Sequence, residues 1–344
     1  MQLDRRLALV SLAGAALAAC QPKRPANASG PATLDTARLS GEFPAIAARA
    51  RPGVLGFGVA LLSPAIAWVS DATARFPLQS VFKVFLAATA LAEVDAGRMK
   101  LGEPILVTRQ NLTPWAGAIT RASLGRGGAL ALPAVDLMAL AVQRSDNAAA
   151  DALMKRVGGP PAVTAWLHGK SLAGISVDRY ETEVQPELNG MGPFQPAWID
   201  RRAWEAARDA VPAEAREAAT VRYLADPRDT ATLPASLDFL TRLAQGQLLS
   251  ATSTRLLLRL MTDSVTGAHR LKAGLPSDAS LAHKTGSSGT DLGLTPATND
   301  IGLVTLVNGR RFALAAYLAG STATEAARDS LIADAARLAV GCVS

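Results

Sequence analysis

The sequence predicts a mixed α/β (α+β) fold, in which an antiparallel sheet built from both chain ends is flanked by helices and carries an inserted all-helical domain. Short apolar runs with Gly and Pro punctuation, typical of strands, occur early, at 54–70, and late, at 281–320. Between them, residues 92–240 carry Ala, Leu and Arg at helical spacing. Strands at both ends with helices in the middle indicate an α+β protein.

Residues 1–19 have the features of an export signal. A charged start is followed by an apolar run at 7–19, which is too short to cross a bilayer as a mature helix. The four residues that end at Cys20 resemble the bacterial lipobox, a signal that is cleaved before its cysteine, which is then lipidated. We therefore expect a periplasmic protein anchored to the membrane through lipid on Cys20. A plain secretory signal and a twin-arginine route through Arg5 and Arg6 are the alternatives.

The rest of the chain divides by composition and pattern. Residues 20–33 have too little apolar surface to fold and predict a tether. The remainder is long enough for one large domain or two closely packed ones. The predicted units are a sheet domain formed by 34–75 and 265–344, and a helical domain at 76–264.

Composition limits the classes of function. Apolar residues make up 49% of the chain and charged residues 19%, so a well-filled core is expected. The net charge is +6, but the arginines are scattered and form no basic run, which makes a nucleic-acid partner improbable. Cys342 is the only cysteine besides Cys20, so no internal disulfide is expected unless Cys20 escapes lipidation. We expect a monomer.

The predicted elements follow in chain order. An amphipathic helix at 34–50 stops before Pro52 and Gly53, and a two-stranded hairpin follows at 54–62 and 65–70. Pro77 excludes helix upstream of itself, so a buried apolar helix begins near Ser80. The later predicted elements are helices at 134–143 and 148–157, a hairpin at 301–307 and 312–318 around Asn308-Gly309, and a closing helix at 322–340.

Ser80 and Lys83 are the first candidate catalytic pair. Three residues apart at the start of a buried helix, they share one face. Burial and the positive end of the helix dipole both disfavour an ammonium there. Lys83 is then able to act as a neutral amine that takes a proton from Ser80. The alternative is a helix cap followed by a surface-seeking lysine.

Two further short motifs lie far along the chain. Ser145-Asp146-Asn147 separates two predicted helices, where Ser145 or Asp146 would also suit an ordinary helix cap. Lys284-Thr285-Gly286 follows a strand-like run, and its glycine would let another backbone or a ligand approach closely. An ordinary exposed strand edge is the alternative for this stretch.

Taken together, Ser-x-x-Lys, Ser-Asp-Asn and Lys-Thr-Gly, in this order, are the set found in class A β-lactamases and penicillin-binding proteins. The chain resembles a class A serine β-lactamase over about residues 34–340. The resemblance implies β-lactam hydrolysis without a cofactor. It implies Ser80 as nucleophile, Lys83 as its activator and Ser145 as proton donor to the lactam nitrogen. It further implies substrate contacts from Asn147, Lys284, Thr285 and Gly286, and an oxyanion hole from the backbone N–H groups of Ser80 and Ser287.

The resemblance also requires a glutamate that holds the deacylating water. Glu181 follows Ser145 by 36 positions (181 − 145), which fits the family, so Glu181 is the predicted base. The stretch matches the family in a second, incompatible way that would put Gln185 at this place. Glu183, Glu187 or no glutamate are therefore the alternatives. With Glu181 as base, Gln185 or Asn189 would hold the water.

The loop that carries this glutamate is expected to span 179–229. Arg179 and Asp229 are predicted to join its two ends by an ion pair. Between them, residues 190–225 form an insert that is unusually long for the family, with Trp198 and Trp204 and a pattern of one or two helices. We consider two interpretations, a surface elaboration and a cover over the cleft that shifts substrate choice.

Other residues carry weaker signals. Trp115 suits an aromatic wall beside the substrate or core packing, and Arg270 suits a carboxylate contact or a surface charge. The three histidines lie far apart, so no metal site is expected. The sequence thus predicts a β-lactamase. The alternatives are a DD-peptidase or penicillin-binding protein with slow deacylation, and a catalytically silent lipoprotein that binds envelope peptides.

Overall fold

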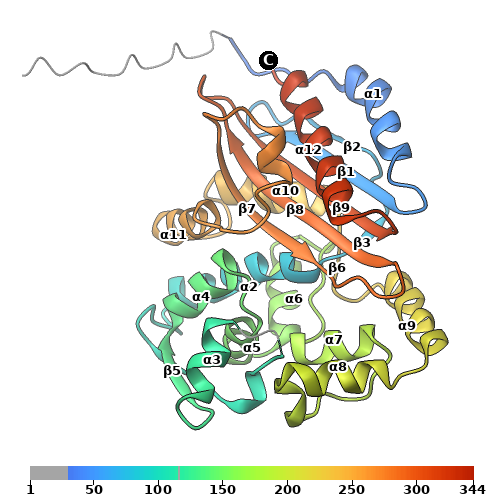
Figure 1. The fold of residues 1–344 in the computed structure, drawn as a ribbon. Helices are drawn as coiled ribbons and strands as arrows, with labels where there is room; N and C mark the ends of the chain where they lie inside the picture. Colours follow the sequence, from blue (N-terminus) through green and yellow to red (C-terminus); the bar gives the residue numbers. More distant parts are fainter. Residues whose placement is uncertain (1–29, 115–116) are drawn as a thin grey trace, which may run out of the picture.

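The computed structural model describes residues 30–114 and 117–344, so the predicted signal, Cys20, most of the tether and Trp115 lie outside the described residues. A sheet with its flanking helices forms one part of the molecule, and a group of helices packs against one end of that sheet (Figure 1). The predicted α+β fold is confirmed.

The main sheet has five antiparallel strands in the order β2-β1-β9-β8-β7. Its strands are β1 (Val54–Leu61), β2 (Ala67–Val69), β7 (Ser280–Ser287), β8 (Thr295–Thr305) and β9 (Arg311–Ser321). β1 pairs with β9 from Val54↔Ala319 to Leu61↔Phe312, so strands from both chain ends lie side by side. Both predicted hairpins, β1–β2 and β8–β9, are present.

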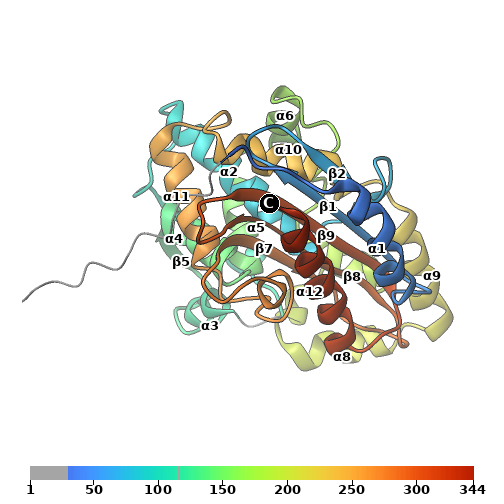
Figure 2. The same ribbon diagram turned by 90° about the horizontal axis from the view of Figure 1, so that it is seen from above.

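Helices cover both faces of the sheet (Figure 2). On one face lie α1 (Thr36–Ala48) and α12 (Glu325–Cys342), and on the other lie α10 (Leu233–Ala244) and α11 (Ala251–Thr262). Cys342 is a free, buried thiol of this core. The range 76–264, assigned to the helical domain from sequence, therefore includes two helices that pack on the sheet.

The helical domain is built around α2 (Phe82–Asp95). Every residue from Phe82 to Leu91 is buried, as expected for a helix that is apolar on all sides. Helices α4 (Ala134–Gln143), α5 (Asn147–Arg156) and α6 (Pro160–Gly169) pack against it. The other helices of this region are α3 (Ala118–Leu124), α7 (Glu181–Leu188), α8 (Arg201–Asp209) and α9 (Ala213–Ala225), with short helical turns at Arg109–Asn111 and Pro196–Ile199.

Two small strand pairs complete the fold. β4 (Pro104–Val107) pairs with β5 (Leu130–Pro133) at the edge of the helical domain. β3 (Arg75–Pro77) pairs with β6 (Thr230–Thr232), which was not predicted. This second pair holds the chain just before Ser80 against the chain just after Asp229, so it ties the start of α2 to the end of the 179–229 loop.

None of the helices in residues 30–114 and 117–344 is both long and apolar enough to cross a membrane.

Candidate active site

Ser80 lies in a short 3₁₀ turn, Gln79–Val81, that runs directly into α2. The turn is held against the sheet by Asn299 of β8, whose Nδ2 donates to the carbonyl oxygens of Pro77 at 2.7 Å and Leu78 at 3.1 Å. A Cβ at Gly286 of β7 would lie only 2.5 Å from the Leu78 carbonyl oxygen. Glycine is therefore required there for the close approach of the two backbones that the sequence predicted.

Lys83 is fully buried and lies at the centre of the site. Its Nζ is 3.0 Å from Ser80 Oγ and 2.9 Å from the Ser145 carbonyl oxygen. It also donates to Asn147 Oδ1 at 2.5 Å and forms an ion pair with Glu181 Oε1 at 3.1 Å. The interpretation of Lys83 as a surface-seeking lysine is wrong. The direct contact of Lys83 with Glu181 was not predicted from the sequence.

The Ser-Asp-Asn motif serves both as a cap and as part of the site. Asp146 caps α5 by accepting the N–H of Ala149 at 3.0 Å, as the capping interpretation expected. Ser145 adopts a left-handed backbone with φ +58°, which is uncommon for a non-glycine residue. Ser145 and Asn147 on either side of the cap contact the two lysines of the site.

Lys284 reaches the same point from β7. Its Nζ lies 3.1 Å from Ser145 Oγ and 2.9 Å from the carbonyl oxygen of Thr285. Burial, and next the nearby charge of Lys83, hold the pKa of Lys284 well below the usual range of a lysine. Ser145 Oγ is thus within hydrogen-bond distance of both lysines, although Lys83 is the farther one at 3.5 Å.

Glu181 is the first residue of α7 and is buried. Its backbone N–H donates to Asp151 Oδ1 at 2.8 Å, and the backbone N–H and hydroxyl of Thr182 donate to Asp151 Oδ2 at 3.1 and 3.0 Å. Burial, and next the charge of Glu181, raise the pKa of Asp151 to about 7. Asp151 therefore anchors the start of α7, a role that no motif in the sequence predicted.

The other candidate carboxylates on α7 point elsewhere. Glu183 accepts the backbone N–H of Tyr180 at 2.8 Å, and Glu187 pairs with Arg179 and Arg228. Gln185, one helical turn after Glu181, donates from Nε2 to Glu181 Oε2 at 2.9 Å. Asn189 instead donates to the backbone carbonyl of Gln185 at 2.8 Å.

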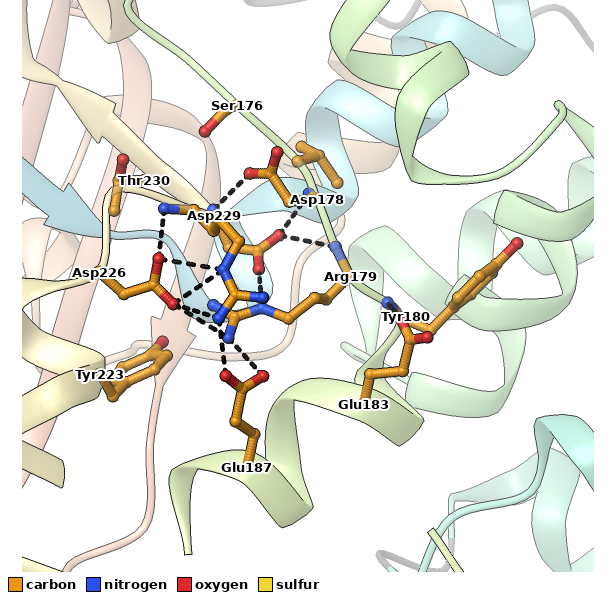
Figure 3. A network of polar contacts seen from close by, with 12 residues as sticks. Ser176, Asp178, Arg179, Tyr180, Glu183, Glu187, Tyr223, Asp226, Asp229 and Thr230 are labelled. Carbon is orange, nitrogen blue, oxygen red and sulfur yellow. Dashed lines mark hydrogen bonds and ion pairs between the residues drawn. The ribbon is translucent and has the colours of Figure 1, made fainter. Parts of the chain in front are cut away.

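The predicted ion pair between Arg179 and Asp229 is confirmed, with Nε 2.6 Å from Oδ2 (Figure 3). Arg179 also pairs with Glu187 at 2.7 Å and with Asp226 at 3.3 Å. Asp229 has φ +51° and accepts the backbone N–H groups of Asp178 and Arg179 at 2.7 and 3.2 Å. The two ends of the 179–229 loop are therefore joined by a charge network whose central pair, Arg179 and Asp229, is buried.

Segment 190–225 folds as a 3₁₀ turn followed by α8 and α9. Phe194, Trp198 and Trp204 pack together, with ring centroids 5.7 to 6.3 Å apart. Arg216 of α9 pairs at 3.0 Å with Asp291, in the loop between β7 and β8. A cavity of about 370 Å³ lies between segment 190–225 and the residues around Ser80. Its lining includes Ser80, Asn147, Glu181 and Ser287 together with Arg201, Trp204, Glu205 and Arg208 of α8. Segment 190–225 is therefore part of the cavity wall and more than a surface elaboration.

Arg270 is buried, so its interpretation as a surface charge is wrong. Its Nη1 donates to the carbonyl oxygens of Gly286 at 3.1 Å and Asn299 at 2.9 Å, and its Nε donates to Asp329 at 2.8 Å. Its Nη2 donates to Ser287 Oγ at 2.8 Å. Arg270 therefore places a positive charge behind the end of β7.

In the part of the chain that the structure describes, no group of three His, Cys, Asp or Glu side chains is placed to hold a metal ion.

Comparisons with known proteins agree with this arrangement. The model of the β-lactamase enzyme family matches residues 41–343. The extended-spectrum β-lactamase PER-1 of Pseudomonas aeruginosa is 30% identical over 77% of this chain and 74% of its own length. β-Lactamase VEB-1 of the same species is 28% identical over 77% of both chains. The solved class A β-lactamase of the last common ancestor of Gram-negative bacteria is 31% identical, with a TM-score of 0.70 over 88% of this chain and 98% of its own. A family match over most of the chain and a shared fold lead to one conclusion: the protein belongs to the class A serine β-lactamase family.

Proposed function

We propose that the protein hydrolyses the amide bond of β-lactams through an acyl-enzyme on Ser80. The observation that carries the proposal is the convergence of three distant stretches of chain on one site. Ser80 Oγ, Lys83 Nζ, Ser145 Oγ and Lys284 Nζ form a continuous chain of contacts of 3.0, 3.5 and 3.1 Å, and Glu181 joins it at Lys83. Acyl transfer requires a group that takes the proton of the nucleophile and a group that gives a proton to the leaving nitrogen.

In acylation, the proton of Ser80 passes to the Lys83–Glu181 pair as Oγ attacks the lactam carbonyl carbon. The negative oxygen that forms is assigned to the backbone N–H groups of Ser80 and Ser287. Both residues line the cavity. When the carbon–nitrogen bond breaks, Ser145 gives its proton to the leaving nitrogen. Lys284, whose pKa is lowered, stands 3.1 Å away and can return a proton to Ser145.

The substrate carboxylate is assigned to the β7 side of the cavity. Lys284 and Arg270 supply positive charge there, and the hydroxyls of Thr285 and Ser287 supply hydrogen bonds. Asn147 is assigned to the amide of the substrate side chain. Its Oδ1 accepts from Lys83, and among the described residues its Nδ2 has no hydrogen-bond partner. α8 closes this end of the cavity, so we infer that it limits which side chains fit.

Deacylation is assigned to Glu181, which activates water for attack on the acyl-enzyme carbonyl. Gln185 contacts the carboxylate directly, whereas the side chain of Asn189 is engaged with the backbone of Gln185. We therefore infer that Gln185, rather than Asn189, completes the water site. One chain supplies every group named here, which supports a monomeric enzyme.

Mass spectrometry during turnover of a penicillin tests the proposal. We expect an acyl adduct on Ser80 that appears within the first turnover and disappears as substrate is consumed, and no adduct on Ser80→Ala. A stable adduct would favour the penicillin-binding protein or DD-peptidase. Absence of both adduct and hydrolysis would favour the silent lipoprotein.

We also propose that lipid on Cys20 holds the enzyme on the periplasmic side of a membrane. The support is the lipobox-like sequence before Cys20 and the short tether that follows it. In fractionated bacteria that express the full chain, we expect the protein in the membrane fraction and the Cys20→Ala variant in the soluble periplasmic fraction. An unchanged distribution of the two proteins would contradict lipid anchoring.

A further inference from the structure

We propose that Tyr223 of α9 is a positioning residue for deacylation, which acts on Glu181 through the side chains of Gln79 and Gln185. The inference rests on the proposed function and extends it, because it gives segment 190–225 a part in the chemistry besides its place in the cavity wall. The hydrogen bonds that carry it run without interruption from α9 to the carboxylate of Glu181.

The first link joins Tyr223 to the residue before the nucleophile. Gln79 is buried and has φ +45°, a left-handed backbone that a glutamine adopts only when its surroundings hold it. Its Nε2 donates to the hydroxyl oxygen of Tyr223 at 2.6 Å. A buried amide rarely leaves its groups unpaired. The Tyr223 hydroxyl can either donate or accept, so the direction of the Gln79 amide is set by Gln185, which donates to its Oε1, and Tyr223 holds the Nε2 end in place.

The second link runs through Gln185 to the predicted base. With Nε2 turned toward Tyr223, Gln79 presents its Oε1 to Gln185, whose Nε2 lies 3.5 Å away. The same Nε2 of Gln185 donates to Glu181 Oε2 at 2.9 Å. A primary amide nitrogen has two hydrogens, so one can bond to each acceptor. Gln79, anchored by Tyr223, thereby holds Gln185 in place, and Gln185 holds one oxygen of the Glu181 carboxylate.

Tyr223 is itself firmly held. Its ring is buried against Val184 and Leu188 of α7, and the Arg179 guanidinium lies 5.9 Å from the ring centroid. Figure 3 shows Tyr223 beside the charge network that joins the ends of the loop. Burial raises the pKa of Tyr223 well above its usual value, so the phenol keeps its proton over the working range of pH. The hydroxyl is therefore a constant partner for Gln79.

Pre-steady-state kinetics of Tyr223→Phe test the inference. The change keeps the ring and its packing but removes the hydroxyl. We expect the deacylation rate constant to fall about tenfold, the size of one good hydrogen bond, and the acylation rate constant to change by less than about threefold. Tyr317→Phe is the matched control. Tyr317 is another buried tyrosine, whose hydroxyl contacts Ser236 Oγ at 2.9 Å, and both of its rate constants should stay within about twofold of wild type.

A double-mutant cycle separates positioning from packing. If Tyr223 acts through Gln185, adding Tyr223→Phe to Gln185→Ala should have less than about a twofold further effect on deacylation. Additive effects, equal losses in both steps, or unchanged deacylation in Tyr223→Phe would overturn the inference. If Tyr223→Phe fails to fold, Gln79→Met removes the same link and must give the same selective loss. Absence of β-lactam turnover by the wild-type protein would instead refute the proposed function.

Discussion

Replacement of Glu181 by glutamine is expected to leave an enzyme that acylates but does not turn over. The amide has the shape of the carboxylate, and its oxygen can still accept from Gln185, but it cannot take a proton from water. General base catalysis contributes about 10²- to 10⁴-fold, so deacylation should slow by that factor. Acylation should slow less, because Lys83 still lies 3.0 Å from Ser80 Oγ. An adduct on Ser80 should therefore accumulate to stoichiometry.

The control for this experiment lies two residues along the same helix. Glu183 is exposed and engaged with the backbone of Tyr180, so Glu183→Gln should retain near-normal turnover. Mass spectrometry of both variants after mixing with a penicillin gives the comparison. Rapid turnover by Glu181→Gln, or trapping by Glu183→Gln, would assign the base elsewhere.

The choice among these carboxylates shows what the sequence could and could not provide. Ser80, Ser145 and Lys284 belong to short local motifs, and the resemblance to class A β-lactamases that these motifs carry implied that they meet. The spacing after Ser145 favoured Glu181, but two overlapping matches left Glu183 and Glu187 open. The helix favours Glu181 among the three, because residues four apart share a face. Glu181 and Gln185 face the nucleophile, whereas Glu183 and Glu187 face away from it.

Other features could not be predicted from the sequence, because they depend on contacts between residues that are far apart in the chain. Asp151 occupies an Ala-rich helix, and only the fold reveals that it holds the backbone of Glu181 and Thr182. The pairing of β3 with β6 joins two runs of three residues each, too short to give a strand signal. Gln79 resembled an ordinary neighbour of Ser80, and its contact with Tyr223 spans 144 positions.

Arg179→Met is expected to destabilise the protein by about 3–5 kcal/mol, the cost of breaking a buried ion pair from one side. The Arg179 side chain is 6% exposed and that of Asp229 is 9% exposed. Burial already raises the pKa of Asp229, and its hydrogen bonds with Arg179 and the backbone oppose that rise. Without Arg179, Asp229 is left as a buried carboxylate without its cation.

Denaturant unfolding measures this loss against Arg38→Met. Arg38 also pairs with a carboxylate, Glu42, at 2.8 Å, but this pair is exposed, so its removal should cost less than about 1 kcal/mol. If the cost at Arg179 comes from the unpaired charge, adding Asp229→Asn to Arg179→Met should restore part of the stability, although Asp229→Asn alone is destabilising. Equal losses for Arg179→Met and Arg38→Met would mean that the β3–β6 pair and the Asp151 anchor hold the loop without the ion pair. Recovery in the double variant would instead show that the charge network stabilises the loop at the point where its two ends, near Arg179 and Asp229, meet.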